Sequence, residues 1–343
     1  MPKKQVSLKP FRNIRKCELH AHIDGSIRPQ TMVDIAKKED IRLPTDDSLE
    51  LDPDTLHGLI KFRIGMDLKT CLESFKVTLK VMQSYESIRR ITMELCEDLA
   101  KDNVTDAELR YCPTLHIQNG LKLDDVVKAT LEGIEEGKKF GIDARLIFCA
   151  IRDFPVAENM KLVRLAGKYQ GRVVGIDLAG NEYDHPPEEH KKVFDLANDM
   201  KLYITAHGGE MKKLFNKTKQ KAIIEQGIKN MYTLMRECHV DRVGHGVSMM
   251  YDKNCMREFK DRGLTLEVSF TSNRQTGAIT RYEQHPVERF FRFGIKTVMC
   301  SDDLMLCDTD LSKEMRKACE HSDLSINDME KMTKYAHDAR FIY

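Results

Sequence analysis

The sequence predicts an α/β protein: a single (β/α)8 barrel domain spanning residues 1–343, with extra helices at the carboxyl-terminal face of the barrel. Short apolar runs alternate with longer amphipathic stretches along the chain of 343 residues, which is typical of parallel βαβ units. There are eight such runs, as many as this barrel has strands. No proline- or serine-rich linker, low-complexity tract or short repeat divides the chain, so we expect one domain. An open, doubly wound parallel sheet is the alternative fold.

The eight apolar runs are the predicted strands, and glycines mark where the helices before several of them end. Gly141, Gly171, Gly263 and Gly294 each precede a run, where a left-handed helix cap is expected. Pro286 lies near the start of the helix that Gly294 ends, and these are the usual positions of the two residue types. The predicted strands span residues 17–22, 107–112, 144–150, 173–178, 202–205, 242–244, 264–269 and 295–300.

The long interval between the first two strands is predicted to be mostly helical over residues 68–101. Cys71, Phe75 and Leu79 lie on one helical stripe of this interval. Residues 1–14 precede the first strand and are expected to form a flexible tail.

The composition excludes several classes of protein. The 55 lysines and arginines nearly balance the 54 aspartates and glutamates, which argues against a dedicated nucleic-acid binder. No apolar run approaches the roughly 18 residues of a membrane span, and the basic amino-terminal segment lacks the apolar stretch of a secretory signal. Ten cysteines without a C-x-x-C pair are typical of reduced thiols in a cytosolic protein. We expect a cytoplasmic monomer that binds neither nucleic acid nor membranes.

Two histidines on the first predicted strand are the first indication of a metal site. Side chains alternate in direction along a strand, so His20 and His22 lie on the same face, about 7 Å apart. Two neutral imidazoles at this spacing can bind one Zn²⁺. By themselves they are a weak signal, because histidine pairs on strands are more often surface or core residues.

Three further polar clusters directly follow predicted strands, and together they favour the metal site. His207 and Glu210 follow the fifth strand, His245 the sixth, and Asp302 and Asp303 the eighth. Barrel enzymes build their active sites at these strand ends. Three histidines and one aspartate can bind a metal with an open position, which lowers the pKa of a bound water to roughly 7. With a nearby carboxyl and imidazole as proton donor and base, the residues predict a metal-dependent hydrolase.

Other chemistries lack their motifs, and single residues have simpler interpretations. There is no G-x-x-x-x-G-K-[ST] loop, no H-E-x-x-H helix, no G-x-S-x-G turn, and no H-x-E…P-C-x-x-C pattern of cytidine-type deaminases. Taken singly, Glu210 could be a helix N-terminal acid, Asp303 a solvated loop acid, and His245 a packing residue between glycines. Eight further histidines are expected at structural or surface positions: His57, His116, His185, His190, His239, His285, His321 and His337.

These residues resemble the motifs of the adenosine deaminase family, a group of metal-dependent barrels of the amidohydrolase type. The resemblance covers nearly the whole chain, from Cys17 to about Phe341. Together the motifs are far more specific than any one of them. They comprise His20-Ala21-His22-Ile23-Asp24-Gly25, residues 109–113, 177–182 and 207–210, Gly244-His245-Gly246, Ser272-Asn273 with Thr276-Gly277, and Asp302-Asp303.

The resemblance implies one Zn²⁺ per chain and the hydrolytic deamination of adenosine and 2′-deoxyadenosine. The products would be inosine and 2′-deoxyinosine with ammonia, as in purine salvage. Glu210 would protonate N1 of the purine, and His245 would orient and deprotonate the attacking water. The implied zinc ligands are His20, His22, His207 and Asp302.

The resemblance also implies how a small-molecule purine nucleoside is held. Asp303 would hydrogen-bond N7, the backbone N–H of Gly180 would meet N3, and His22 would face the substrate as well as the metal. Asp24 would accept from the ribose 5′-hydroxyl. A carboxylate at this place repels a 5′-phosphate, and relatives that act on N6-methylated AMP carry asparagine there, which favours a free nucleoside.

Two other functions are open at this point, and the sequence departs from the family pattern at three places. The protein could deaminate an N6-substituted or 5′-modified adenine nucleoside or nucleotide. It could also be a barrel without turnover that binds a partner through residues 211–221. This added segment contains five lysines, and the favoured interpretation is an insertion at the solvated surface. Gly208 replaces the usual alanine and should keep the geometry. Leu304 replaces the usual proline, which predicts a less rigid loop.

Overall fold

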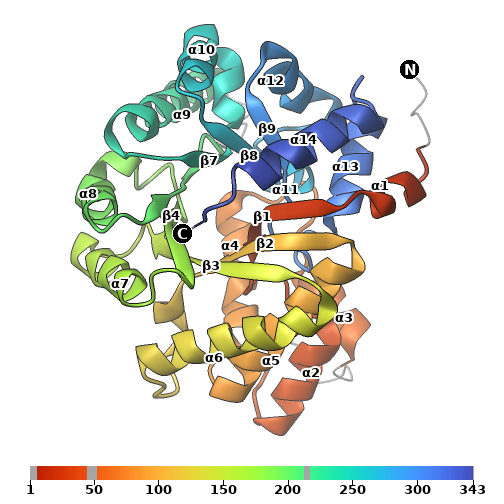
Figure 1. The fold of residues 1–343 in the computed structure, drawn as a ribbon, viewed down its shortest axis with the longest axis vertical. Helices are drawn as coiled ribbons and strands as arrows, with labels where there is room; N and C mark the ends of the chain where they lie inside the picture. The colour runs from red at the N-terminus through yellow and green to blue at the C-terminus, as the bar shows by residue number, and fades with distance from the viewer. Residues whose placement is uncertain (1–5, 45–51, 212–216, 343) are drawn as a thin grey trace.

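The computed structural model describes residues 6–44, 52–211 and 217–342, with parallel strands at the centre and helices around the outside (Figure 1). The predicted strands all overlap observed ones, and the fifth is followed by a second short piece, β6. Within the described residues the strands are β1 (Lys16–His22), β2 (Val104–Tyr111), β3 (Asp143–Ile151), β4 (Val173–Ala179), β5 (Tyr203–Ile204), β6 (His207–Gly208), β7 (Arg242–His245), β8 (Thr265–Val268) and β9 (Lys296–Met299).

Helices connect the strands in alternation, as the apolar pattern predicts. In the part of the chain that the structure describes, no helix is both long and apolar enough to cross a membrane. The α-helices are α1 (Lys9–Asn13), α2 (Pro29–Lys38), α3 (Pro53–Ile60), α4 (Leu68–Thr78), α5 (Tyr85–Lys101), α6 (Leu123–Gly137), α7 (Val156–Lys168), α8 (Lys191–Asp199), α9 (Lys217–Glu237), α10 (Lys253–Asp261), α11 (Phe270–Gln275), α12 (Val287–Phe293), α13 (Leu311–Glu320) and α14 (Ile326–Asp338).

The strands form two parallel sheets, each in chain order. One contains β1 to β5 and the other β6 to β9. The first strand also lies beside the segment that follows the last. The backbone N–H of His22 donates to the carbonyl of Asp302 at 2.8 Å, and the N–H of Asp302 donates to the carbonyl of His20 at 2.9 Å. This bridge places the ends of β1 and β9 at one edge, so polar residues from both meet there.

The helix ends confirm the expected glycine caps, and the predicted helix over 68–101 is divided. The four glycines expected to end helices have φ between 71° and 93°, a left-handed conformation that favours glycine. The interval 68–101 forms α4 and then α5, because Ser84 caps a new helix: its hydroxyl accepts from the N–H of Ser87 at 3.2 Å.

The predicted flexible tail is wrong for residues 9–13, which form α1. Phe11 is only 1% exposed, so the helix docks on the core through an aromatic side chain. The buried ammonium of Lys16 donates to the carbonyls of Phe11 and Ile14 at 3.0 and 2.9 Å. These bonds satisfy carbonyls at the helix end and hold the segment against β1. Residues 1–5 lie outside the described part of the chain.

Candidate metal centre and active site

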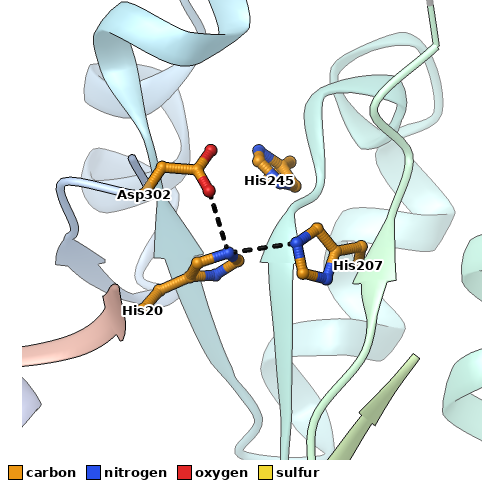
Figure 2. A group of neighbouring side chains, drawn as sticks. All are labelled: His20, His207, His245 and Asp302. Atoms are coloured by element: carbon orange, nitrogen blue, oxygen red, sulfur yellow. Dashed lines mark hydrogen bonds and ion pairs between the residues drawn. The ribbon is translucent and has the colours of Figure 1, made fainter. Parts of the chain in front are cut away.

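Four strand ends bring metal-ligating side chains together. His20 lies on β1, His207 on β6 and His245 at the last position of β7, while Asp302 follows β9. Figure 2 shows the four side chains around one centre, and one ligating atom from each lies within 4.8 Å of all the others. His20, His245 and Asp302 are buried, and the side chain of His207 is 12% exposed. Imidazole and carboxylate groups so enclosed form a metal site.

His22 lies at the same centre. Its Nε2 atom is 3.3 Å from Nε2 of His20, 3.2 Å from Nε2 of His207 and 3.5 Å from Oδ1 of Asp302. Nε2 of His20 is 3.1 Å from Nε2 of His207 and 3.3 Å from Oδ1 of Asp302. Ligand atoms 2.0–2.2 Å from a tetrahedral zinc ion are about 3.3–3.6 Å apart. The residues present therefore fit a zinc ion, and His245 faces Oε2 of Glu210, 3.5 Å from its Nε2.

Two buried carboxylates orient the imidazoles of His20 and His207. Nδ1 of His20 lies 2.8 Å from Oε2 of Glu267, and Nδ1 of His207 lies 3.1 Å from Oδ1 of Asp177. When each Nδ1–H donates to its carboxylate, each Nε2 directs a lone pair at the centre. Arg110 contacts both carboxylates, at 3.2 Å for Asp177 and 3.0 Å for Glu267. Although burial opposes their ionisation, the surrounding positive charges hold the pKa of both below its ordinary value.

At the strand ends that carry the site, two residues have a strained backbone, and a glycine lies unusually close to the side chain of Asp303. His245 and Asp302 both have a φ of 65°, a left-handed conformation that costs of order 1–3 kcal/mol for a residue with a side chain. At Gly25, a Cβ atom would lie 1.7 Å from Oδ1 of Asp303. Only glycine therefore lets the carboxyl of Asp303 take its place over the first strand.

Glu210 is buried beside the metal cluster, on the loop after β6. The hydroxyl of Thr276 donates to Oε1 of Glu210 at 2.7 Å. Glu182 holds the loop, because its carboxylate accepts from the backbone N–H groups of Gly209 at 2.9 Å and Glu210 at 3.1 Å. Burial raises the pKa of Glu210 above its ordinary value. The carboxyl therefore keeps its proton to higher pH than a solvated glutamate and can act as an acid.

A cavity of about 70 Å³ lies against these residues. Glu210, His245 and Asp303 line it, and α4 contributes apolar side chains that include Phe75. A larger outer hollow of about 460 Å³ shares Phe75 and Gly180 with the inner cavity. The arrangement suits a ligand with one end at the metal cluster and the other toward the opening.

Three polar atoms at these two hollows are buried without a hydrogen-bond partner among the described residues. They are Oδ1 of Asp24, Oδ1 of Asp303 and Nε2 of His245. Burial raises the pKa of Asp24 to about 7, and burial together with the nearby Asp302 raises that of Asp303. An unpaired buried polar atom costs roughly 1–3 kcal/mol, so these atoms are the places where a polar ligand is best accepted.

The structure brings every site residue expected from the sequence to the cluster or to the two hollows. The sequence interpretation assigned no role to Arg110, although residues 109–113 were among the family motifs, and it did not single out Glu267. Glu267 bonds the imidazole of His20, and Arg110 contacts Glu267. Their signal was a charged residue on a strand predicted to lie at the centre of the protein, where an unpaired charge would be very costly. It also did not foresee the hydrogen bonds that join His285 to Asn273 and Asn273 to His245. The residues placed together are His20, His22, Asp24, Gly180, His207, Glu210, His245, Asp302 and Asp303.

The three departures have different outcomes. A Cβ at Gly208 would lie 2.5 Å from a terminal carbon of Leu234, so an α9 leucine occupies the space that an alanine would need. The loop at Leu304 is held where a less rigid one was expected, because the Leu304 N–H donates to Oγ of Ser26 at 3.0 Å, a bond that proline cannot form. Within the segment 211–221, residues 212–216 lie outside the described residues.

A parallel α/β fold with a His/His/His/Asp cluster beside a buried glutamate defines an amidohydrolase-type metal hydrolase. The family model for adenosine deaminase matches residues 15–343. The chain is 35% identical over 331 residues to the adenosine deaminase of Clostridium acetobutylicum, covering 96% of this chain and 93% of that protein. The chain belongs to the adenosine deaminase family.

Solved structures with lower identity share the fold. An amidohydrolase from Burkholderia ambifaria with bound zinc superposes with a TM-score of 0.85 at 23% identity, covering 99% of this chain and 90% of that one. The N6-methyl-AMP deaminase of Arabidopsis thaliana gives a TM-score of 0.78 at 24% identity, covering 98% and 95%. Both likenesses concern the fold alone.

Proposed function

We propose that the protein is a zinc-dependent adenosine deaminase that hydrolyses adenosine and 2′-deoxyadenosine to inosine and 2′-deoxyinosine with release of ammonia, a step of purine salvage. The observation that carries this proposal is the placement of a buried, protonatable Glu210 beside a cluster of four metal-ligating side chains, five of whose six ligand-atom distances are 3.1–3.5 Å. Membership of the family supports the substrate class.

His20, His22, His207 and Asp302 are the proposed ligands of one Zn²⁺ per chain. Five of the six distances between their ligating atoms are 3.1–3.5 Å, close to the edge lengths of a zinc tetrahedron. A zinc ion held there would supply a water whose pKa is lowered to about 7. Glu267 and Asp177 keep the imidazoles of His20 and His207 in the orientation that this binding needs.

The acid groups around the inner cavity match the nitrogen atoms of a purine. Glu210 would donate its proton to N1, which makes C6 electrophilic toward water. Asp303 would donate to N7, since N7 only accepts and the raised pKa of Asp303 favours its protonated form. His245, whose Nε2 is unpartnered among the described residues, would orient the attacking water.

The remaining contacts would hold the sugar and the far edge of the base. Gly180 lines both hollows, so its backbone N–H could reach N3. Asp24 lines the outer hollow, where Oδ1 could accept from the 5′-hydroxyl. His22 lines both hollows and would contact the substrate as well as the metal.

We further infer that the two sheets are parts of one closed (β/α)8 barrel in a single domain, with α3 and α4 as extra helices at its carboxyl-terminal face. The parallel bridge between Ala21 and Asp302 supports closure at one edge. At the other edge, β5 pairs with β4 and leads directly into β6, which pairs with β7. Residues of α4 line the inner cavity, which supports the placement of this helix over the carboxyl-terminal ends of the strands.

We also propose a cytoplasmic monomer whose partner is a small nucleoside rather than a nucleic acid or a membrane. All ten cysteines are buried and none of them forms a disulfide, which supports a reducing compartment. The near-balance of charge supports the absence of a polyanionic partner.

One observation favours the second candidate, a deaminase of 5′-phosphorylated or N6-substituted substrates. Lys69 and Lys76 line the outer hollow and could meet a phosphate. Carboxylates outnumber these two lysines, so the hollow as a whole disfavours an anion and the nucleoside is preferred. The carboxylates that line it are Asp24, Glu73, Asp153 and Asp184.

A spectrophotometric assay tests the proposed function. Adding the zinc-loaded protein to adenosine should lower the absorbance near the adenosine maximum as inosine forms, and removal of zinc by a chelator should stop the change. A protein that holds one zinc per chain and leaves adenosine, 2′-deoxyadenosine and AMP unchanged would contradict the proposal and favour a binding module without turnover.

Replacing Asp24 with asparagine should weaken turnover of adenosine and narrow its advantage over AMP. At pH 8, above the pKa of about 7 that burial gives Asp24, its carboxyl is charged, and a hydrogen bond from a hydroxyl to it contributes about 1.5–3 kcal/mol. The loss of this bond should lower kcat/KM for adenosine by roughly 10–150-fold. The same change removes repulsion of a phosphate. The measurement is kcat/KM for adenosine, AMP and N6-methyl-AMP, side by side.

Asp153→Asn is the matched control, because Asp153 lines the same hollow but its side chain is 54% exposed. This variant should change the ratio of adenosine to AMP only slightly. If AMP or its methylated form is the better substrate of the unmodified protein, the nucleoside assignment is wrong.

A further inference from the structure

A chain of hydrogen bonds begins at the backbone and ends at His245. The backbone N–H of Val287 donates to Nδ1 of His285 at 3.1 Å. Nε2 of His285 lies 3.0 Å from Oδ1 of Asn273. Nδ2 of Asn273 in turn lies 2.8 Å from Nδ1 of His245. All three side chains are buried, and the ring of Phe270 packs 4.6 Å from that of His285, centroid to centroid.

The backbone donor sets the direction of every bond in this chain. Because an N–H can only donate, Nδ1 of His285 is an acceptor and the proton of the neutral ring is on Nε2. Burial lowers the pKa of His285 to about 3, so the ring is neutral at pH 7. Its Nε2–H donates to Oδ1 of Asn273. The amide NH2 of Asn273 therefore faces His245 and donates to Nδ1.

This order leaves one tautomer for the neutral imidazole of His245. With Nδ1 accepting a hydrogen bond, the proton is on Nε2, the atom that faces the cavity and has no hydrogen-bond partner among the described residues. We propose that Asn273 and His285 are positioning residues that hold the proton of His245 on Nε2, so that His245 donates a hydrogen bond to the attacking water instead of removing its proton. The proton that this water loses would pass to solvent, since a bound zinc ion would lower the pKa of the water to about 7.

The tautomer of His245 is inferred from the hydrogen bonds alone. The role of His245 toward the attacking water rests, in addition, on the proposed deaminase function. It changes the role expected from the sequence, in which His245 was the base. It also gives His285, expected at a structural or surface position, a part in the chemistry. A histidine held in the wrong tautomer loses activity even when its position is unchanged.

The tautomer can be read directly by nuclear magnetic resonance of zinc-loaded protein with ¹⁵N-labelled histidine. The His245 signals are identified by their loss in His245→Gln. In the unmodified protein they should show an unprotonated Nδ1 and a protonated Nε2. In Asn273→Asp the side chain has only acceptor oxygens, so Nδ1 of His245 should become protonated. A proton on Nδ1 of His245 in the unmodified protein would overturn the proposal.

Kinetics separate positioning from mere structural support. Asn273→Asp should lower kcat for adenosine by roughly 10²–10⁴-fold, the range for acid–base groups and for a reversed histidine tautomer. KM should stay near the wild-type value. Asn159→Asp is the matched control, since Asn159 is also buried and its amide bonds the backbone of Ile151 at 3.2 and 2.8 Å. It should lower Tm while keeping kcat; a normal kcat in Asn273→Asp would contradict the proposal.

A pair of variants at position 285 tests the donor. Glutamine can place an N–H near the position of Nε2, so His285→Gln should retain most of the turnover. His285→Leu has no donor and should lose it, with Asn273 free to rotate. Equal kcat values for the two variants would overturn the proposal. If the unmodified protein does not deaminate adenosine, the proposed function fails, and the resonance experiment still decides the tautomer.

Discussion

Replacing Glu210 with glutamine is expected to lower kcat for adenosine by several orders of magnitude, while the protein still binds zinc and nucleoside. The loss of general acid catalysis alone accounts for roughly 10²–10⁴-fold. Glutamine keeps the shape of the side chain and can still accept from the hydroxyl of Thr276, which lies 2.7 Å from Oε1. It carries no acidic proton, whereas burial raises the pKa of Glu210 and keeps its proton available. The measurements are kcat, KM and zinc content.

Glu94→Gln is the matched control for this substitution. Glu94 is also buried, but it lies on α5, where it accepts from the hydroxyl of Thr31 and pairs with Arg90 at 2.8 Å. Its replacement should lower stability and leave kcat close to normal. Near-normal turnover by Glu210→Gln would show that another group supplies the proton to the purine.

Replacing His22 or His207 with alanine is expected to remove zinc and turnover together, whereas His245→Ala should retain zinc and lose turnover. The Nε2 atoms of His22 and His207 are 3.2 Å apart, the spacing of two ligands of one ion, and Nε2 of His245 lies instead 3.5 Å from Oε2 of Glu210. Since the loss of a residue that merely orients a ligand costs about 10–100-fold in affinity, the loss of a ligand should exceed that. Zinc per chain after dialysis against a competing chelator is the measurement.

The same three variants distinguish the two possible ligand sets. If His245→Ala loses zinc while His22→Ala retains it, the metal is held by His20, His207, His245 and Asp302, whose ligating atoms also cluster within 4.8 Å. Zinc binding should raise Tm of the unmodified protein, because the ion binds the folded chain. If the chelator leaves the Tm of the unmodified protein unchanged and this protein contains no zinc, the metal site itself is refuted.

Local patterns in the sequence were enough to predict the alternation of strands and helices and most of the candidate site. Glycine caps such as Gly141 and Gly294 depend on a backbone angle that few other residues adopt, so they are visible in the sequence. His207, His245 and Asp302 follow apolar runs, and the carboxyl ends of parallel strands meet at one edge. Their proximity therefore follows from the fold class without knowledge of any contact.

The tertiary structure decided which atoms meet. The predicted fifth strand is followed by a second piece because β5 pairs with β4 and β6 with β7, a change of partner that the apolar run from Leu202 does not encode. Phe11 is anchored by burial, and Arg110 by two carboxylates from other strands. Asn273 and His285 lie on separate segments and reach His245 only when these pack together. These contacts depend on which remote segments pack together and on what they bury, so only the tertiary structure decides them. The sequence by itself determined the local conformations of those segments.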